Sequence, residues 1–149
     1  MAVKFFGHLP ENPTKLKAIV KYCLRSYRAL PRQVNIIFVS QKVIQQLNRQ
    51  YRQHNKPTTI LSFNFDLINL SKDQQSIGEI YLSSAEIRLA AKKSKLAYQS
   101  MLYHLVIHGC LHLAGFHHQK MQSANTMHKE EKKLAEKFTP NILPSHVIH

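Results

Sequence analysis

The sequence contains no tryptophan and only two cysteines among its 149 residues. Two cysteines cannot form the disulfide framework that stabilises many small secreted domains, so we expect Cys23 and Cys110 to be buried free thiols. Free thiols persist in a reducing compartment, and we therefore predict a cytoplasmic protein.

The chain also lacks a hydrophobic run long enough for a transmembrane helix. Its longest apolar stretch, residues 102–116, is interrupted by three histidines and is shorter than the ~20 residues that span a bilayer. The first residues show no apolar signal-peptide segment. We expect no membrane partner.

Acidic residues are scarce: 8 Asp and Glu stand against 21 Lys and Arg, for a formal charge of +13. Such an excess favours a polyanionic partner, and we expect RNA rather than a merely solvated basic surface. Basic residues recur at helical spacing in two segments, residues 17–28 and 88–95.

The stretch 108–118, which reads HGCLHLAGFHH, carries the clearest chemical signal. His108 and His112 are four residues apart, so a helix would place both rings on one face. Gly115 suits the end of that helix, after which the chain can bring His118 back to the same point. Three neutral imidazoles suit one Zn²⁺ and leave a fourth position open, which is typical of catalytic zinc. Another divalent metal such as Ni²⁺ could occupy the same ligands.

The same spacing matches the metzincin proteases at every position but one. Those enzymes carry Glu directly after the first histidine as a general base, whereas this chain has Gly109. Peptide hydrolysis by that mechanism is therefore not expected. His104, one turn before His108, is either a residue that supports the metal site or contacts the substrate, or a hydrogen-bonded packing residue.

Periodicity predicts helices, then strands, then helices around one small sheet. We expect an α+β fold with about four strands in a mixed sheet and about five helices, in a single domain over residues 1–149. Residues 140–149 read as an irregular tail. Strands are predicted at 3–8, 35–39 (buried on both faces), 61–65 and 77–83. Helices are predicted at 13–28, after Ser40 to about 52, after Ser84 to 94, at 98–114 and at 122–138. Ser40 and Ser84 are the predicted N-caps of their helices, and Val43, Ile44 and Leu47 are the predicted apolar face of the helix after Ser40.

Three motifs in order resemble the YbeY family of rRNA-maturation endoribonucleases. Segment 108–118 is similar to that family's HGxLHLxGyDH pattern, and segments 48–52 and 56–63 are similar to its NxxYR and KPT(D/N)VLSF patterns. Segment 77–82, IGEIYL, is similar to its G(D/E)IxI strand. The order and spacing agree over about residues 35–135.

The resemblance implies a zinc-dependent endoribonuclease whose metal is held by His108, His112 and His118. It implies cleavage of single-stranded RNA during 3′-end maturation of small-subunit rRNA and in ribosome quality control, with the small ribosomal subunit as partner. Arg52 matches a family arginine placed near the metal, and we predict that it is catalytic.

Two positions depart from the family pattern: His117 stands where Asp is usual, and Thr59 where Asp or Asn is common. Glu79 is the candidate for a carboxylate base, although the sequence does not place it in space. Two alternatives remain: a non-catalytic ribosome- or RNA-binding protein with a structural metal, and a zinc hydrolase acting on peptides or small molecules. The oligomeric state and the substrate-binding residues are not predicted.

Overall fold

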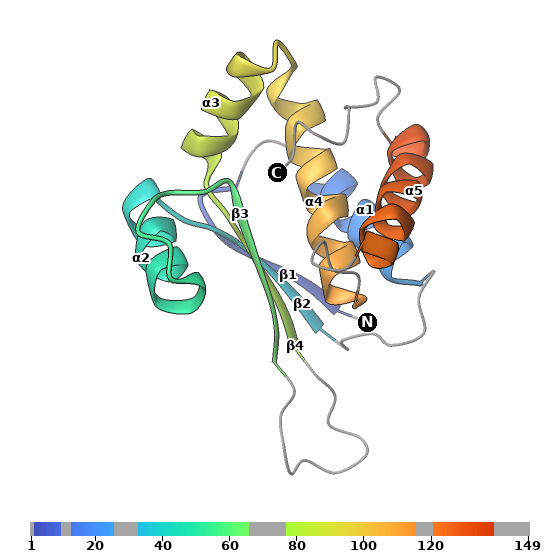
Figure 1. Ribbon diagram of the computed structural model, residues 1–149, viewed down its shortest axis with the longest axis horizontal. Helices are drawn as coiled ribbons and strands as arrows, with labels where there is room; N and C mark the ends of the chain where they lie inside the picture. The colour runs from blue at the N-terminus through green and yellow to red at the C-terminus, as the bar shows by residue number, and fades with distance from the viewer. Residues whose placement is uncertain (1, 10–12, 26–32, 66–76, 116–120, 139–149) are drawn as a thin grey trace.

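The structure is a computed structural model that describes residues 2–9, 13–25, 33–65, 77–115 and 121–138 (Figure 1). Its elements follow in the order β1 (Ala2–Gly7), α1 (Pro13–Arg25), β2 (Gln33–Phe38), α2 (Gln41–Arg52), β3 (Ile60–Phe65), β4 (Ile77–Leu82), α3 (Ser84–Lys93), α4 (Tyr98–Leu113) and α5 (Met121–Phe138). Each predicted strand and helix is present, with ends that differ by a few residues at most in the described segments. The predicted tail, residues 140–149, lies outside them.

The four strands form one mixed sheet in the order β1-β2-β4-β3. Strands β1, β2 and β4 run parallel, and β3 pairs antiparallel with β4. Ile36 in β2 pairs with Phe5 on one side and Ile80 on the other, and Ile80 pairs in turn with Ser62 of β3. Parallel neighbours need crossover connections, which the helices provide. The predicted α+β fold with a small mixed sheet is confirmed.

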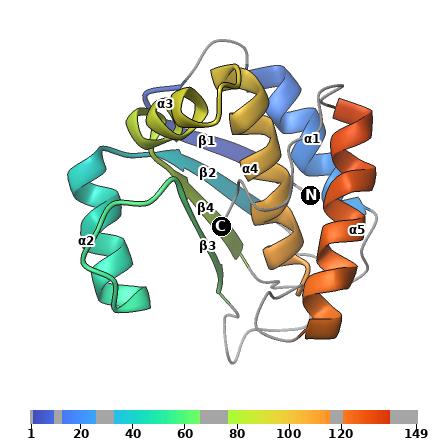
Figure 2. The ribbon, with the colours of Figure 1, turned by 45° about the horizontal axis from the view of Figure 1, so that its top comes forward.

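Only one face of the sheet is fully covered. In β2, Val34, Ile36 and Phe38 are buried, whereas the residues between them are half-exposed. Strand β4 shows the same alternation. The prediction that segment 35–39 is buried on both faces was therefore wrong. Helices α1, α4 and α5 lie on one side of the sheet and cover it, whereas α2, on the other side, leaves that face of β2 half-exposed (Figures 1 and 2).

Helix α4 is the centre of the covered side. Its residues Met101–Leu111 are all buried, because the helix contacts α1, α3, α5 and the strands β3 and β4. A helix enclosed in this way is mostly apolar around its circumference. The histidines within the enclosed part, His104 and His108, lie inside the protein.

The helix starts confirm one predicted cap and correct another. Ser40 caps α2, since its Oγ accepts a hydrogen bond of 3.2 Å from the Val43 N–H. Helix α3 is capped by Ser83, whose Oγ accepts from the Glu86 N–H, and not by Ser84 as we predicted. The Ser84 hydroxyl is instead 3.1 Å from the hydroxyl of Tyr98 at the start of α4.

Both cysteines are free and buried, as the sequence predicted. A hydrogen bond with Cys23, followed by burial, raises the pKa of the Cys110 thiol. None of the helices in the described part of the chain is long and apolar enough to cross a membrane.

Candidate metal centre

Three histidines occupy successive turns on one face of α4, at positions 104, 108 and 112. His104 and His108 are buried, at 2% and 7% exposure, and His112, nearer the helix end, is half-buried. The exposure of the rings thus increases toward the C-terminal end of the helix.

The rings of His108 and His112 converge. Their Nε2 atoms are 3.0 Å apart, and the rings meet edge to face with centroids 4.7 Å apart. Two Nε2 lone pairs facing each other would repel, so the contact needs either a proton or a cation between them. Two nitrogens at ~2.0–2.1 Å from a tetrahedral metal would lie about 3.3 Å apart, so the observed 3.0 Å is compatible with a shared metal ion as well as with a hydrogen bond.

A buried carboxylate from α5 orients His108. Glu131 Oε1 is 2.5 Å from His108 Nδ1, and Glu131 is only 2% exposed. A proton on Nδ1, donated to this carboxylate, leaves Nε2 with its lone pair directed at His112. Metal-binding histidines generally have such a partner on the second ring nitrogen. The donor set therefore fits a divalent metal.

The pKa of Glu131 reflects this environment. Burial alone would raise its pKa, but interactions with His104 and His108 outweigh burial and lower the pKa to about 2. The carboxylate is thus ionised throughout the ordinary pH range. A permanent negative charge beside His108 makes that ring a stronger ligand for a cation.

His104 shares the same carboxylate more loosely. Its Nε2 is 3.9 Å from Glu131 Oε2, and within the described residues neither ring nitrogen of His104 has a hydrogen-bond partner. A shift of about 1 Å would bring the pair to hydrogen-bond distance. Of the roles considered for His104, the structure favours support of the site through Glu131.

Sequence reasoning missed Glu131. The signal that could have indicated its burial is its position four residues after Met127 and three before Leu134, which places it on the same helix face as these two buried residues. A carboxylate on the apolar face of an amphipathic helix calls for a buried partner, since an unpaired buried charge is unfavourable.

The helix ends as predicted. Gly115 has φ +100°, and its N–H donates to the His112 carbonyl over 3.0 Å. His117 and His118 lie outside the described residues. Across the segments that the structure does describe, no group of three or more His, Cys, Asp or Glu residues forms a metal site. The structure thus places two of the three predicted ligands together, and the third stays a prediction.

Gly109 is where α4 touches the sheet. A Cβ at this position would lie 3.0 Å from both the Ile60 Cδ1 and the Ser62 Oγ of β3. The position that carries the general base in metzincins thus faces a packed strand, and a glutamate side chain there has no space.

Arg52, the last residue of α2, approaches the site from the other side of β3. Its Nη2 donates to the Ser62 carbonyl over 2.9 Å, and its guanidinium lies 5.0 Å from the centre of the Phe63 ring. Ser62 also faces Gly109, the residue next to His108. Ser62 therefore links Arg52 on one side of β3 to helix α4 on the other. The predicted catalytic arginine is therefore fixed in place but exposed.

Glu79 does not accompany the histidines. In β4 the residues on either side of it, Gly78 and Ile80, are buried, so Glu79 points to the opposite face from α4. There its carboxylate accepts a hydrogen bond from the Tyr81 hydroxyl over 3.3 Å. The structure gives this glutamate no place as a base beside His108 and His112.

The fold and the site define an α+β protein in which a buried carboxylate orients a histidine pair at the end of the central helix. The family profile described as Endoribonuclease YbeY matches residues 9–139. The chain belongs to the YbeY family.

Individual relatives agree with that assignment. The Endoribonuclease YbeY of Thermotoga petrophila is 36% identical over 104 residues, which cover 69% of this chain and 65% of that protein. The Endoribonuclease YbeY of Pelagibacter ubique is 31% identical over 125 residues, covering 83% of this chain and 82% of that protein. The match with the Endoribonuclease YbeY of Buchnera aphidicola covers 63% of that protein. The chain thus spans just under two thirds of the length of this relative and of the Thermotoga petrophila relative.

The fold also resembles a solved structure. The solution structure of TM1509 from Thermotoga maritima gives a TM-score of 0.53 and covers 96% of this chain and 98% of that chain. The two sequences are 24% identical, so this likeness concerns the fold alone.

Proposed function

We propose that this protein is a zinc-dependent endoribonuclease that cuts single-stranded RNA. The observation that carries the proposal is the convergence of His108 Nε2 and His112 Nε2, 3.0 Å apart, with Glu131 holding the first ring. The relatives named Endoribonuclease YbeY support the choice of RNA. His118 would be the third ligand, from just past the end of α4.

When bound, the metal would act as a Lewis acid on a phosphoryl oxygen and would lower the pKa of a nearby water. The chain's own contributions are positional. Glu131 fixes the tautomer of His108, and Arg52 presents a guanidinium whose orientation is set by Ser62 and Phe63. A planar guanidinium is suited to the charge that builds on a phosphate during cleavage.

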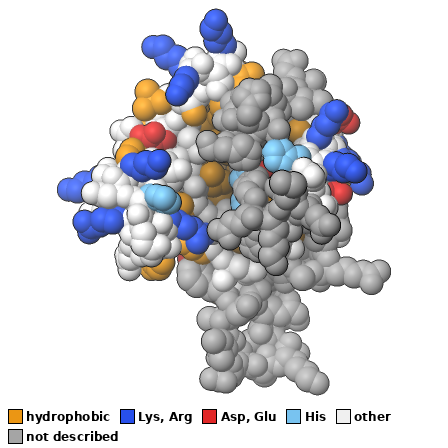
Figure 3. All heavy atoms as spheres, in the orientation of Figure 1, with side chains coloured by type: hydrophobic (Ala, Val, Ile, Leu, Met, Phe, Trp, Pro, Cys, Tyr) orange, Lys and Arg blue, Asp and Glu red, His pale blue; other side chains and the backbone are white. Residues whose placement is uncertain are grey.

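The substrate we infer is the 3′ region of small-subunit rRNA, with the small ribosomal subunit as partner and ribosome quality control as the setting. The family and the charge of +13 support this inference. Figure 3 shows Lys and Arg side chains over α2 and α3 and further ones, mixed with acidic groups, over α5. The two buried free thiols agree with action in the cytoplasm.

The central test compares RNA with protein as substrate. Zinc-loaded protein is incubated with a single-stranded fragment from the 3′ region of small-subunit rRNA and, separately, with casein. We expect RNA cleavage, no casein cleavage, and loss of RNA cleavage in His112→Ala. His54→Ala, which changes an exposed histidine, is the matched control and should retain activity.

Cleavage that survives in His112→Ala would contradict the proposal. Metal analysis of the same samples should give one zinc per chain, reduced in His112→Ala and in His118→Ala. One zinc sealed by four protein ligands, with no RNA cleavage, would instead identify an RNA-binding protein with a structural metal. The attacking group in RNA cleavage could be a metal-activated water or the RNA's own 2′-hydroxyl. A 2′-deoxy substitution at the cleaved position separates these routes, since complete loss of cleavage assigns the attack to the 2′-hydroxyl.

A further inference from the structure

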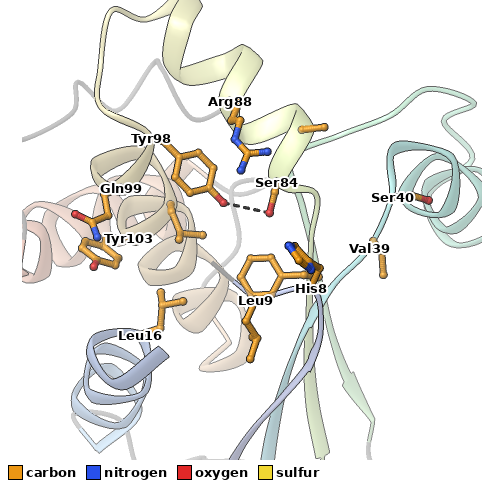
Figure 4. A pocket seen from close by; sticks show the side chains of 13 residues that line it. His8, Leu9, Leu16, Val39, Ser40, Ser84, Arg88, Tyr98, Gln99 and Tyr103 are labelled. Atoms are coloured by element: carbon orange, nitrogen blue, oxygen red, sulfur yellow. Dashed lines mark hydrogen bonds between the residues drawn. The ribbon is translucent and has the colours of Figure 1, made fainter. Parts of the chain in front are cut away.

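A second concave site lies at the opposite end of α4 from the histidines. It is a cavity of about 770 Å³ at the carboxyl ends of the parallel strands. His8 and Leu9 follow β1, Ser40 follows β2, and Ser84 follows β4 (Figure 4). In sheets with parallel strands, ligands commonly bind at this edge. Its volume lies within the ~300–1,000 Å³ typical of small-molecule sites.

The cavity is separate from the metal centre. Tyr98 and Gln99, in the first turn of α4, line it, whereas His112 is near the last residue of the same helix. At 1.5 Å per residue, fourteen residues of helix separate Tyr98 from His112 by about 20 Å. A ligand in the cavity would not touch the histidine pair.

One side of the cavity combines an aromatic ring with a cation. The Arg88 guanidinium is 5.1 Å from the centre of the Tyr98 ring, and the Tyr98 hydroxyl is held 3.1 Å from Ser84 Oγ. These three side chains come together above the opening in Figure 4. Among the described residues Arg88 has no carboxylate partner. An unpaired guanidinium beside a hydroxyl is the combination that binds a phosphate.

The other side is aromatic and apolar. Its lining residues Tyr103, Leu16, Phe38 and Leu102 are only 1–6% exposed, whereas Leu9 is 37% exposed. Lys15 Nζ lies 4.8 Å from the centre of the Tyr103 ring. The apolar surface open to a flat aromatic group on this side is therefore Leu9 together with the exposed part of Tyr103.

The electrostatics select an anion. No Asp or Glu is among the described residues that line the cavity. Helices α2, α3 and α4 all begin beside it, and the residue before α4, Ala97, provides no side-chain cap for its first N–H groups. Helix N-termini carry partial positive charge and bind anions.

We propose that this cavity binds a nucleoside monophosphate unit, with the phosphate at Arg88 and Ser84 and the base against the Tyr103 side. The unit could be a free nucleotide or one nucleotide of an RNA strand, since both present the same groups. The proposal stands apart from RNA cleavage at the histidine pair, because it depends on other residues.

The test is titration of the isotope-labelled full chain with AMP, followed by amide NMR. We expect saturable shifts at Arg88, Tyr98 and Gln99, and none at His108 or His112. Adenosine and ribose 5-phosphate, which each carry half of the ligand, should bind at least about tenfold more weakly than AMP. A short RNA that displaces AMP from these residues would assign the site to RNA, and failure to displace it would assign the site to free nucleotide.

Arg88→Ala should weaken AMP binding about tenfold or more, because it removes a charged phosphate contact. Lys92→Ala is the matched control: it removes one positive charge from the same exposed helix face, one turn further along. It should change affinity less than about threefold. Tyr98→Leu should weaken AMP and ribose 5-phosphate alike, because the Tyr98 hydroxyl holds Ser84 and its ring packs against Arg88 on the phosphate side, and it should leave the melting temperature close to that of wild type.

Two results would overturn the proposal. One is equal weakening by Arg88→Ala and Lys92→Ala, which would reduce the effect to overall charge. The other is AMP-induced shifts confined to His108 and His112. Both are read from binding alone, so they are distinct from any failure of the nuclease assay.

Discussion

The Nδ1 atom of His108 and the Oε1 atom of Glu131 lie 2.5 Å apart, although the residues are 23 positions apart in the chain. This contact joins α4 to α5 inside the protein and decides which nitrogen of His108 can bind a metal. It explains why the neighbouring Nε2 faces His112. The contact therefore connects the packing of two helices to the chemistry of the site.

Replacing Glu131 should weaken metal binding more than it disturbs the fold. For Glu131→Gln we expect zinc affinity to fall by about 10–100-fold, the usual effect of losing a carboxylate partner of a ligating histidine. The measurement is competition with a zinc chelator, with circular dichroism to verify the fold. Glu136→Gln, which changes an exposed glutamate on the same helix, should bind zinc as wild type does. Equal affinities in both variants would show that Glu131 does not act through His108.

Metal removal should lower stability by an amount set by the free zinc concentration. At a free zinc level of 100 times the dissociation constant, binding to the folded state adds about 2.7 kcal/mol to the free energy of unfolding. Wild type should therefore melt at a higher temperature with zinc than after chelation, while His112→Ala should melt at the same temperature in both. A zinc-dependent increase that persists in His112→Ala would place the ion elsewhere.

Gly109 should tolerate a methyl group far better than a glutamate. In Gly109→Ala the new Cβ meets the tips of two side chains, Ile60 and Ser62, at 3.0 Å, and the helix preference of alanine offsets part of the strain. We expect a change within about 2 kcal/mol. Gly109→Glu, which restores the metzincin pattern, should cost more than about 3 kcal/mol because it drives a charge into packed strands. Urea denaturation measures both. A stable Gly109→Glu variant that cleaves casein would contradict this account of Gly109.

Much of α4 could be predicted because its signals are local. The spacing of His108 and His112 and the glycine at 115 are read directly along the chain, and the structure shows the helix end and the paired rings as expected. Helix α2 was found equally well from Ser40, but its apolar face was partly misassigned. Val43 is 39% exposed, whereas Asn48, which was not assigned to the buried face, is buried and donates from its Nδ2 to the Lys56 carbonyl.

The features that were missed depend on contacts between distant segments. Nothing within α5 says that Glu131 meets His108, because that pairing needs the two helices to be packed. The apolar run of β2 likewise fits a strand buried on one face or on both, and the coverage depends on where the helices lie. The general base was predicted at Glu79, but strand alternation directs that side chain to the other face of the sheet.

The pKa of Tyr81 tests whether Glu79 lies beside it on the sheet face opposite α4. Burial, and then the charge of Glu79, raise the pKa of its phenol above the ordinary value of 10.0. A pKa that is higher in the folded than in the unfolded state stabilises the fold below pH 10, and this contribution is lost as pH rises through the folded-state value. In Glu79→Gln the pKa of Tyr81 should fall but stay above 10.0, because burial remains. An NMR titration of ring-labelled tyrosine measures the shift, and an unchanged midpoint in Glu79→Gln would show that the two groups are not coupled.

Arg52→Lys should separate catalysis from stability. Lysine keeps the positive charge but cannot lie flat over Phe63 while donating to Ser62, so its ammonium would not be held where the guanidinium is. We expect RNA cleavage by the zinc-loaded protein to fall by about 10²–10³-fold, the range seen when a fixed donor to a developing negative charge is removed. The free energy of unfolding should change by less than about 1 kcal/mol, because the side chain is exposed. Arg49→Lys, at another exposed position of α2, is the matched control and should cleave RNA at nearly the wild-type rate. If both variants lose activity equally, the role of Arg52 is general attraction of RNA, and its fixed position beside Ser62 has no part in the reaction.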